Sequence, residues 1–423
     1  MLGTGGVIHC RSDQAGAYLL PRGRRQEFSM IVAGGVYREE CVWPNWSRIF
    51  GSGGRAAAAI SRISPGSALY AYASREWAED VRISMTNFGV DPHLVEIEAD
   101  ITFSYFHPLS VPVLTPHPIA HVATPHRVEG AAVLRFGFVE GDAIVKADRA
   151  VYDPQHWSEA LNFSKNGSKA NKLAIVLNET ELELSTGTNG DAAAEKLCDI
   201  SGAEVIVVKR GPHGATVWDA GTTTPIPSYR SSDVFKIGSG DIFSAIFAAL
   251  WAEQRTSPVE AAHRASSAVS HYVGSRAAQI SLADCQPQTP VFGEYKGRHI
   301  YVAAPFFNLG QRWAVEEIRN GLRSVGGRVF SPLHNVGSSG TSKDIATRDL
   351  KGLEEAGSIL AVLDGEDAGT LFEIGYARRC KIPVVILSEL PRPESLTMLE
   401  GTDCHIVGDI CTAVYHAMWA AMR

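Results

Sequence analysis

An acidic loop between an apolar segment and a helix carries the residues with the most specific chemistry. Residues 358–363 predict a buried strand, and Asp364, Asp367 and Glu373 follow it. Ligands of open α/β sheets bind where strands end in this way, so we expect Asp367 and Glu373 to face one pocket. One carboxylate can attack an anomeric carbon while another positions or protonates the leaving base, because negative charge stabilises an oxocarbenium-like state.

The same spacing allows a second interpretation of Glu373. Thr370 and Glu373 fit a capping box, in which the glutamate accepts a hydrogen bond only from a backbone amide. The surrounding acids are then a solvated loop. Spacing alone favours this second interpretation.

A glycine-rich turn, Gly238-Ser239-Gly240-Asp241, precedes the apolar run 245–252, which predicts a buried helix. Glycines let the backbone approach a ligand closely, and amides at a helix start suit a transferring phosphoryl group. An aspartate beside them can accept the proton of a substrate hydroxyl. The alternative is that Asp241 only caps the helix.

Residues 107–126 contain four histidines, His107, His117, His121 and His126. Imidazole is a common metal ligand. Five prolines interrupt the stretch and break any helix that would align His117 with His121. The pattern therefore favours a proline-rich surface loop over a metal site.

The elements that position these residues alternate along the chain. Strand-like segments at 30–33, 132–134, 150–152, 173–177 and 204–208 are separated by helix-like segments, which predicts α/β layers around a largely parallel sheet. Residues 284–298 form the predicted linker, because they contain two prolines and two glycines without amphipathic period. The pattern then restarts with strands at 299–303, 328–330, 358–363 and 383–387 and helices at 311–325, 343–356 and 370–380, which predicts a doubly wound domain. The stretch up to Glu27 is poorly patterned and is interpreted as a lead-in.

Composition excludes several classes of protein. The 423 residues suggest roughly two or three domains. The net charge of −7 argues against a nucleic-acid binder, and the longest strictly apolar run, 245–252, is far shorter than a membrane helix needs. Seven scattered cysteines and no secretion signal at the start predict a cytoplasmic protein without a disulfide framework.

Residues 28–283 resemble the ribokinase-like (PfkB) family of sugar and nucleoside kinases. Gly238-Ser239-Gly240-Asp241 is similar to its Gly-Ala-Gly-Asp motif, and Asn178 and Glu181 match its Asn-x-x-Glu motif. Asp153-Pro154 stands where the family tends to carry Asp-Pro. The resemblance implies ATP and Mg²⁺ as cofactors. It assigns Gly238, Ser239 and Gly240 to an anion hole and makes Asp241 the catalytic base. It also assigns Asn178 and Glu181 to organising magnesium and phosphate, Gly211 and Gly214 to nucleotide binding, and Gly53 and Gly54 to the substrate side.

The kinase resemblance has departures on the side of the acceptor substrate. A glutamate, Glu39 or Glu40, would replace the usual aspartate after the first strand, and Ala58 stands where an asparagine is common. Phe235-Lys236-Ile237 replaces the Asp-x-Thr before the anion hole. The departures imply an unusual substrate, a weak kinase, or a non-catalytic module that senses a ligand or forms oligomers.

Residues 299–423 resemble the nucleoside 2-deoxyribosyltransferase family. The opening strand and loop, 299–308, and the segment 368–377 around Glu373 recur in the family's order. The resemblance implies Glu373 as nucleophile, Asp349 as base contact and Asp367 as sugar-hydroxyl contact. It also implies that Tyr301 and Phe307 line the sugar pocket, that Met398 approaches it, and that the reaction needs no cofactor. The alternative for these three residues is that they only fill the core.

Together these resemblances predict an α/β protein with two domains, a ribokinase-like sandwich followed by a smaller flavodoxin-like domain. The expected protein is a bifunctional cytoplasmic enzyme that acts on nucleosides, free bases and ATP, binds no nucleic acid or membrane, and forms a homo-oligomer. Glu373 would take the deoxyribosyl group from one base and pass it to another base or to water. The alternative is a hydrolase of nucleosides or nucleotides with a degenerate kinase-like domain.

Overall fold

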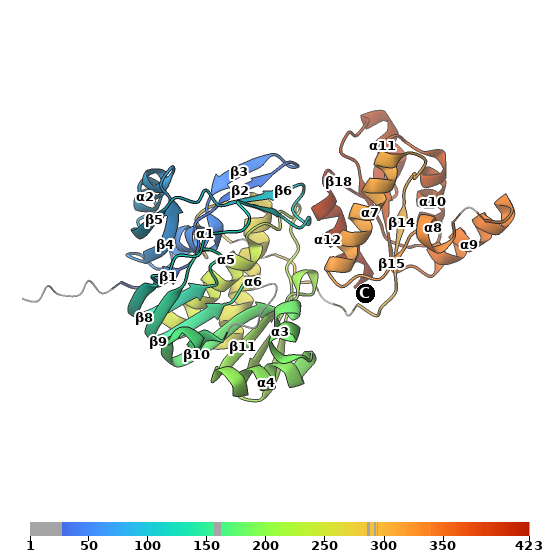
Figure 1. The fold of residues 1–423 in the computed structure, drawn as a ribbon. Helices are drawn as coiled ribbons and strands as arrows, with labels where there is room; N and C mark the ends of the chain where they lie inside the picture. Colours follow the sequence, from blue (N-terminus) through green and yellow to red (C-terminus); the bar gives the residue numbers. More distant parts are fainter. Residues whose placement is uncertain are drawn as a thin grey trace, which may run out of the picture.

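The computed structural model describes residues 28–155, 162–285, 288–291, 293, 295–337 and 339–422. The predicted lead-in up to Glu27 lies outside these residues, as do four positions of the predicted linker and the last residue of the predicted second domain. Two separate sheets with flanking helices make up the described chain (Figure 1).

The N-terminal sheet has nine strands in the order β13-β12-β11-β10-β9-β8-β1-β4-β5. In this order, the strands from β11 through β1 to β5 run parallel. The last two strands, β12 and β13, pair antiparallel at the opposite edge from β5. The apolar runs of β1, of residues 173–177 in β10 and of residues 205–208 in β11 are buried throughout, as is typical of parallel strands covered on both faces. The bounds are β1 Ile31–Ala33, β4 Ala68–Ser74, β5 Asp91–Ile97, β8 His126–Phe136, β9 Ala143–Asp153, β10 Lys169–Asn178, β11 Val205–Lys209, β12 Ala215–Asp219 and β13 Thr222–Ile226.

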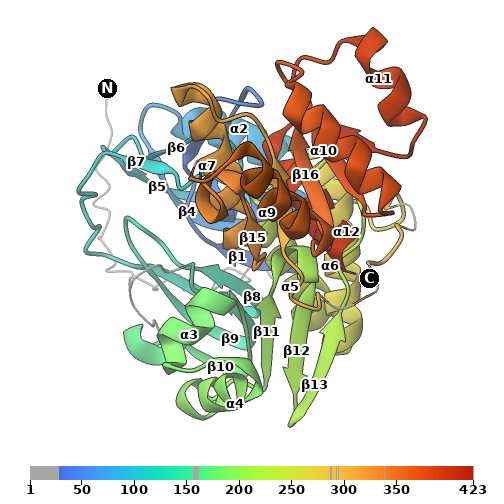
Figure 2. The same ribbon diagram turned by 90° about the vertical axis from the view of Figure 1, so that its right-hand side faces the viewer.

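Helices cover both faces of this sheet (Figure 2). One face carries α1 Gly51–Ile60, α2 Ala78–Asn87, α5 Ser239–Ala248, which runs on into the π-helix η3 Ala249–Glu253, and α6 Pro258–Ser275. The other face carries α3 Glu179–Thr186 and α4 Gly190–Ser201. Two short 3₁₀ turns, η1 Phe163–Asn166 and η2 Gly211–His213, lie between strands. Helix α5 is buried from Asp241 to its end, and its buried residues other than Asp241 and Ser244 are apolar.

A second, four-stranded sheet in the N-terminal part was not predicted from the sequence. Its order is β3-β2-β6-β7, with bounds β2 Arg38–Cys41, β3 Trp46–Ile49, β6 Thr102–Tyr105 and β7 Val113–Thr115. These strands have three or four residues and most are partly exposed, so they lack the apolar runs that identify the central strands. Strand β7 lies in the histidine-rich stretch.

The C-terminal sheet has five parallel strands in the order β15-β14-β16-β17-β18. Numbered within this part, the order is 2-1-3-4-5, which is the order of flavodoxin-like folds. The strands are β14 Ile300–Ala303, β15 Val329–Phe330, β16 Ser358–Val362, β17 Val384–Leu387 and β18 His405–Val407. The predicted strands and helices of this part agree with the structure to within two residues at each end.

Helices also flank the C-terminal sheet on both faces. Helices α7 Leu309–Ser324 and α12 Ile410–Ala421 pack on one face. The opposite face carries α9 Ser342–Glu354, α10 Ala368–Arg379 and α11 Pro393–Glu400. The short helix α8 Pro332–Asn335 follows β15. Among the described helices, none combines the length and the apolar character that a membrane span requires.

Helices α7 and α12 face the N-terminal part of the chain (Figure 1). Apolar side chains of both parts belong to one continuous buried core. Three hydrogen bonds join α12 to the N-terminal backbone: the amide of Val234 donates to Thr412 Oγ1 (2.9 Å), Trp419 Nε1 donates to the carbonyl of Pro212 (3.1 Å), and His416 Nε2 lies 2.9 Å from the carbonyl oxygen of Ser231. The two parts are therefore docked through a buried contact.

Candidate active sites

The glycine-rich turn is the N-terminus of α5. Gly238 has φ of 78°, a left-handed conformation that favours glycine, and a Cβ atom there would lie 2.1 Å from Arg55 Nε. The amide of Ser239 donates to the carbonyl of Lys236. The amides of Gly240 and Asp241 therefore remain as first-turn donors, which have no partner within the helix. This is a geometry suited to an anion.

Both carboxylate oxygens of Asp241 have partners. Arg55 Nη1 donates to Oδ2 at 2.7 Å, and Gln155 Nε2 donates to Oδ1 at 2.6 Å. The guanidinium of Arg55 is fully buried and also pairs with Glu39. Burial raises the pKa of Glu39, and the charge of Arg55 opposes that shift. Asp241 does not cap its own helix through its side chain, so the capping alternative is wrong.

A second buried ion pair lies beside the start of α5. Lys209 Nζ donates to Asp153 Oδ2 at 2.6 Å, and Ser244 Oγ donates to the same oxygen at 2.6 Å. Burial opposes the charge of Lys209, but Asp153 and Glu181 together raise the pKa of its ammonium. Burial and then the charge of Asp153 raise the pKa of Glu181 to about 7.

The predicted motif residues Asn178 and Glu181 form the capping box of α3. Asn178 Oδ1 accepts from the amide of Glu181, and Glu181 Oε2 accepts from the amide of Asn178. Asp153 Oδ1 is buried without a partner. Mg²⁺ prefers carboxylate oxygens and keeps several waters, so Asp153 and Glu181 fit a hydrated ion. No cluster of three or more metal-ligating side chains occurs within the described ranges.

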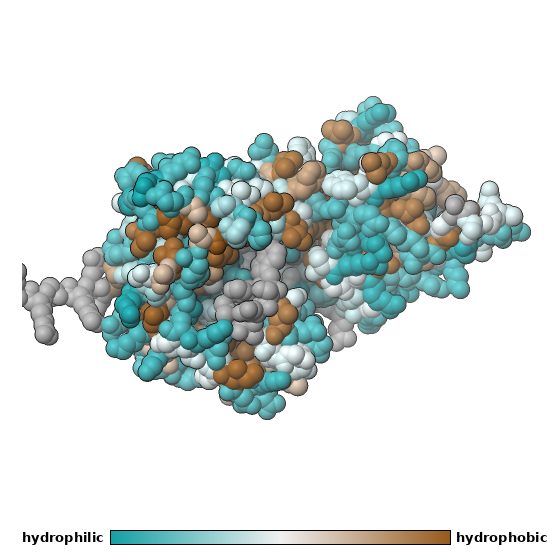
Figure 3. Space-filling view, in the orientation of Figure 1, coloured by the Kyte–Doolittle hydropathy of each residue, from teal (hydrophilic) through white to brown (hydrophobic). Residues whose placement is uncertain are grey.

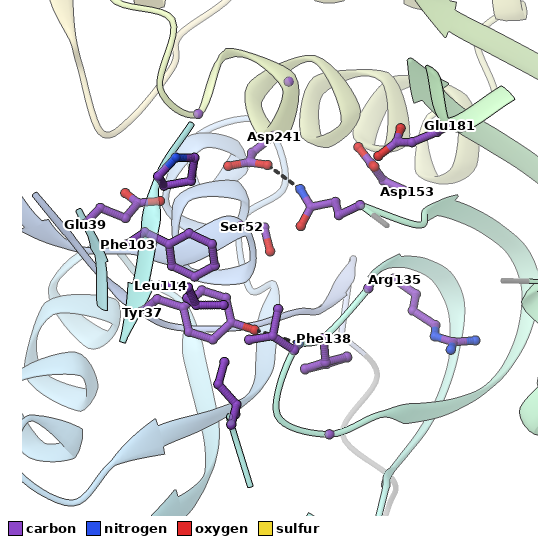
Figure 4. Close-up of a pocket in the computed structure, with 18 of the residues that line it drawn as sticks. Tyr37, Glu39, Ser52, Phe103, Leu114, Arg135, Phe138, Asp153, Glu181 and Asp241 are labelled. Atoms are coloured by element: carbon purple, nitrogen blue, oxygen red, sulfur yellow. Dashed lines mark hydrogen bonds between the residues drawn. The ribbon is translucent and has the colours of Figure 1, made fainter. Parts of the chain in front are cut away.

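Two cavities meet at the start of α5. The larger, about 1020 Å³, lies under the four-stranded sheet and is lined by Tyr37, Glu39, Phe103, Phe138 and Asp241 among others (Figure 4). The smaller, about 680 Å³, is lined by α3, the turn at η2, α5 and α6. Both cavities are lined by the same five residues at their junction: Asn178, Glu181, Lys209, Lys236 and Gly240. A group bound at this junction is reachable from both cavities.

The remaining predicted glycines divide between binding and packing positions. Gly211 and Gly214, the predicted nucleotide-binding glycines, line the smaller cavity. Gly53 approaches Gly34 so closely that a Cβ atom would lie 2.4 Å from the carbonyl oxygen of Gly34. Ser52, the residue before them, lines the larger cavity, whereas Gly53 and Gly54 are not among its lining residues.

The histidine-rich stretch has two roles in the structure. His117 and His121 line the larger cavity. His107 is buried, and its Nε2 lies 2.9 Å from Glu317 Oε2 of α7. Because residues of this stretch face a cavity and the second domain, the interpretation as only a surface loop is incomplete.

In the C-terminal part, Glu373 on α10 forms a hydrogen bond with Tyr301. The hydroxyl of Tyr301, on β14, donates to Glu373 Oε1 at 2.5 Å. Burial raises the pKa of Glu373 to about 7; the bond from Tyr301 lowers it, and the charges of Asp349 and Asp367 add to the rise. Asp349 Oδ1, on α9, is buried without a partner, and burial raises the pKa of this carboxyl.

The capping-box interpretation of Glu373 is wrong. Helix α10 begins at Ala368, and its N-cap is Asp367, whose Oδ2 accepts from the amide of Thr370 at 2.8 Å. Glu373 therefore lies in the second turn, where it bonds a side chain from another element. The spacing predicts Thr370 as the N-cap, three residues after the actual N-cap, Asp367.

Two of the three residues predicted to lie near the sugar pocket, Phe307 and Met398, are open to solvent. Phe307 follows β14, packs against Phe306 and is 69% exposed, and Met398 on α11 is 74% exposed. Phe372, beside Glu373, is 62% exposed. In Figure 3, apolar side chains gather over the region where Figure 1 shows α10 and α11. Tyr301, by contrast, is fully buried.

Arg55 and Gln155 are the main site residues that sequence reasoning missed. Their partners lie 186 and 86 residues away in the chain. One signal was present for Arg55: it is a charged residue within the small-residue run 51–59, which can only form a tightly packed helix. Gln155 gave no comparable signal.

Two family models match the chain. Residues 150–285 match the pfkB family carbohydrate kinase, and residues 300–406 match the nucleoside 2-deoxyribosyltransferase. The chain therefore combines one segment that matches the kinase family with a second segment that matches the transferase family. The N-terminal part is the predicted ribokinase-like α/β domain, and the C-terminal part fits the predicted flavodoxin-like domain. No curated protein matches the chain.

Several solved structures are similar to the N-terminal part. A pyrophosphate-dependent kinase in the ribokinase family, complexed with a pyrophosphate analog and myo-inositol, is 15% identical, covers 58% of this chain and 94% of its own, and has a TM-score of 0.43. The ribokinase from Thermotoga maritima is 14% identical, with coverages of 62% and 96% and a TM-score of 0.41. The fructokinase from Vibrio cholerae, in its fructose, ADP and calcium ion bound form, is 15% identical, with coverages of 60% and 96% and a TM-score of 0.45.

Proposed function

We propose that the C-terminal domain cleaves the N-glycosidic bond of a 2′-deoxynucleoside and transfers the deoxyribosyl group, with Glu373 as nucleophile. The observation that carries the proposal is the contact of Glu373 with the Tyr301 hydroxyl, in a setting that raises the pKa of the glutamate to about 7. A carboxylate with this pKa is partly ionised near neutrality and is held in one orientation by its donor.

The proposed reaction has two balanced steps. A carboxylate oxygen of Glu373 bonds to C1′ while the C1′–N bond breaks, and the base leaves with the electron pair and takes up a proton. A nitrogen of a second base, or the oxygen of water, then bonds to C1′ and loses its proton, while the C1′–O bond breaks and returns Glu373 as a carboxylate. Asp349 has a buried oxygen without a partner, which suits a contact with the base, and Asp367 Oδ1 is outside its capping bond and suits a sugar hydroxyl.

Base exchange tests this proposal. Wild-type protein is incubated with one deoxynucleoside, with and without a second free base, and products are separated chromatographically. The matched control is Glu394→Ala, a surface variant at the exposed start of α11. If exchange is lost in Glu373→Ala and kept in this control, the result supports Glu373 as the nucleophile. Normal exchange in folded Glu373→Ala overturns it. Cleavage at the same rate without the acceptor assigns the domain to the hydrolase alternative.

We propose that the N-terminal domain, with its boundary in the linker 284–298, transfers a phosphoryl group from a nucleotide to a sugar or nucleoside hydroxyl. The meeting of two cavities at the first-turn amides of α5 supports this reaction. The nucleotide lies in the smaller cavity and the acceptor in the larger. Asp153 and Glu181 would hold a Mg²⁺ ion, which would neutralise phosphate charge when bound. Gly240 and Lys236 bind the transferred group, and Asp241 takes the hydroxyl proton.

One observation favours a second function for this domain. Arg55 and Gln155 occupy both oxygens of Asp241, so the carboxylate acts as a base only when a substrate hydroxyl replaces one of them. If that replacement does not occur, the cavity binds a ligand without turnover. Phosphorylation of nucleosides and sugars with ATP and Mg²⁺, compared between wild type and Asp241→Asn, separates a kinase from a binding module.

We also propose a homo-oligomer in which a second copy covers the open edge around Glu373. The exposed rings of Phe307 and Phe372 and the exposed side chain of Met398 support it, since such groups are usually covered in a stable assembly. Light scattering after size exclusion tests it, and a monomer at micromolar concentration contradicts it.

A further inference from the structure

The smaller cavity is built from both domains. Most of its lining comes from the N-terminal part, but five lining residues belong to the C-terminal part: Ser324, Val325, Gly326, Tyr415 and Trp419. The first three end helix α7 or follow it, and the last two lie on α12. The cavity is therefore closed on one side by the deoxyribosyltransferase-like domain.

The contact that forms this wall is specific. Trp419 Nε1 donates to the carbonyl of Pro212, which also accepts from Ser228 Oγ at 2.6 Å. Pro212 belongs to the turn η2, whose glycines line the cavity. The ring of Tyr415 reaches the same turn, since a Cβ atom on Gly211 would lie 3.4 Å from its hydroxyl. The wall is thus fixed on the turn expected to bind a nucleotide.

The two ends of this cavity differ in chemistry. One end carries the first-turn amide of Gly240 and the ammonium groups of Lys209 and Lys236. Lys209 is paired with Asp153, whereas no acidic side chain in the described part of the chain pairs with Lys236. Away from the junction with the larger cavity, apolar residues of both domains line only this cavity: Val269 from α6, and Val325 and Trp419 from the second domain.

We infer that the C-terminal domain completes the nucleotide site of the N-terminal domain, with its α7–α12 edge covering the base of a bound nucleoside di- or triphosphate. The inference rests on the proposed phosphoryl-transfer function, because that function places the nucleotide in this cavity. A cationic end suits the phosphates and an apolar end suits the base. Nucleotide affinity therefore depends on residues of the transferase-like domain.

The inference is tested by calorimetric titration of the full-length protein with two probes, ADP and inorganic pyrophosphate, each with Mg²⁺. Pyrophosphate reaches only the cationic end, so it reports on that end alone. The variant Ser324→Trp fills the base side from an exposed position and leaves the core intact. Ser342→Trp, at an exposed position on α9, is the matched control. Trp419→Ala removes the wall itself, and its thermal unfolding is recorded to verify folding.

We expect Ser324→Trp to weaken ADP binding at least about tenfold, equal to about 1.4 kcal/mol, and pyrophosphate binding less than about twofold. Ser342→Trp keeps both affinities. Equal ADP affinity in wild type, Ser324→Trp and folded Trp419→Ala overturns the inference and leaves the phosphoryl-transfer proposal standing. If wild type binds neither probe, the nucleotide site itself is wrong, and both proposals fail together.

Discussion

The contact between Tyr301 and Glu373 makes a quantitative prediction about pH. Replacing Tyr301 by phenylalanine removes the donor to Glu373 Oε1 and leaves the ring packed against Phe330. This bond lowers the pKa of Glu373, which is about 7 in the wild type, so its loss raises that pKa. A hydrogen bond to a charged group contributes about 1.5–3 kcal/mol, and one pKa unit equals about 1.4 kcal/mol. The pKa should therefore rise by about one unit, taking the lower limit because Glu373 is partly exposed.

The assay is kcat/KM for base release from a deoxynucleoside between pH 5 and pH 10. A nucleophilic carboxylate is active when ionised, so the wild-type rate rises through about pH 7 and the rate of Tyr301→Phe rises about one unit higher. The two rates converge at high pH. The control is Tyr376→Phe, on the same helix as Glu373. The hydroxyl of Tyr376 bonds Glu354 at the surface, so its removal should leave the pH profile unchanged. An unshifted acidic limb in folded Tyr301→Phe refutes the reasoning.

Three further predictions concern stability. Glu373 has a folded-state pKa of about 7 against 4.5 for the free side chain, so the folded protein keeps this carboxyl protonated and loses stability as pH rises between these values. At pH 8, Glu373→Gln should have a free energy of unfolding about 1–2 kcal/mol above that of wild type, and therefore a higher unfolding temperature. Below pH 4 it should show no gain. Arg55→Met leaves Glu39 and Asp241 without their cation and should cost about 3–5 kcal/mol in urea unfolding, with part recovered by adding Glu39→Gln; no recovery would contradict the ion-pair account. Gly238→Ala should lower the free energy of unfolding more than Gly66→Ala does, because both glycines have φ near +80° but only Gly238 would place its Cβ against Arg55. An equal loss of about 1 kcal/mol in both variants would contradict the close approach at Gly238.

The alternation of elements could be predicted because buried parallel strands are apolar runs bounded by glycine and polar turns. The predicted segment 173–177, for example, lies within strand β10, and the predicted segment 358–363 matches strand β16 to within one residue. The flavodoxin-like order of the C-terminal sheet could be predicted from the family resemblance. The short strands of the four-stranded sheet could not, since half-exposed segments of three or four residues have no distinct period.

The chemistry of each site was predictable only as far as its local motif. Asp241 and Glu373 stand out in their own segments, but their partners come from remote elements: Arg55 from α1 and Tyr301 from β14. Such pairings depend on the topology, which brings segments 72 and 186 residues apart into contact. The sequence of α12 does carry a signal for its docking, because it is apolar around most of the helix, as is expected of a helix enclosed on all sides.

The most direct test of the account is to detect the deoxyribosyl-enzyme ester on Glu373. Protein is mixed with a 2′-deoxynucleoside in the absence of an acceptor base, quenched in acid, digested and analysed by peptide mass spectrometry. The account predicts one added deoxyribosyl group on the peptide that contains Glu373, and its disappearance when a second base is added before the quench. Base release with that peptide unmodified, and with inverted configuration at C1′, would contradict it.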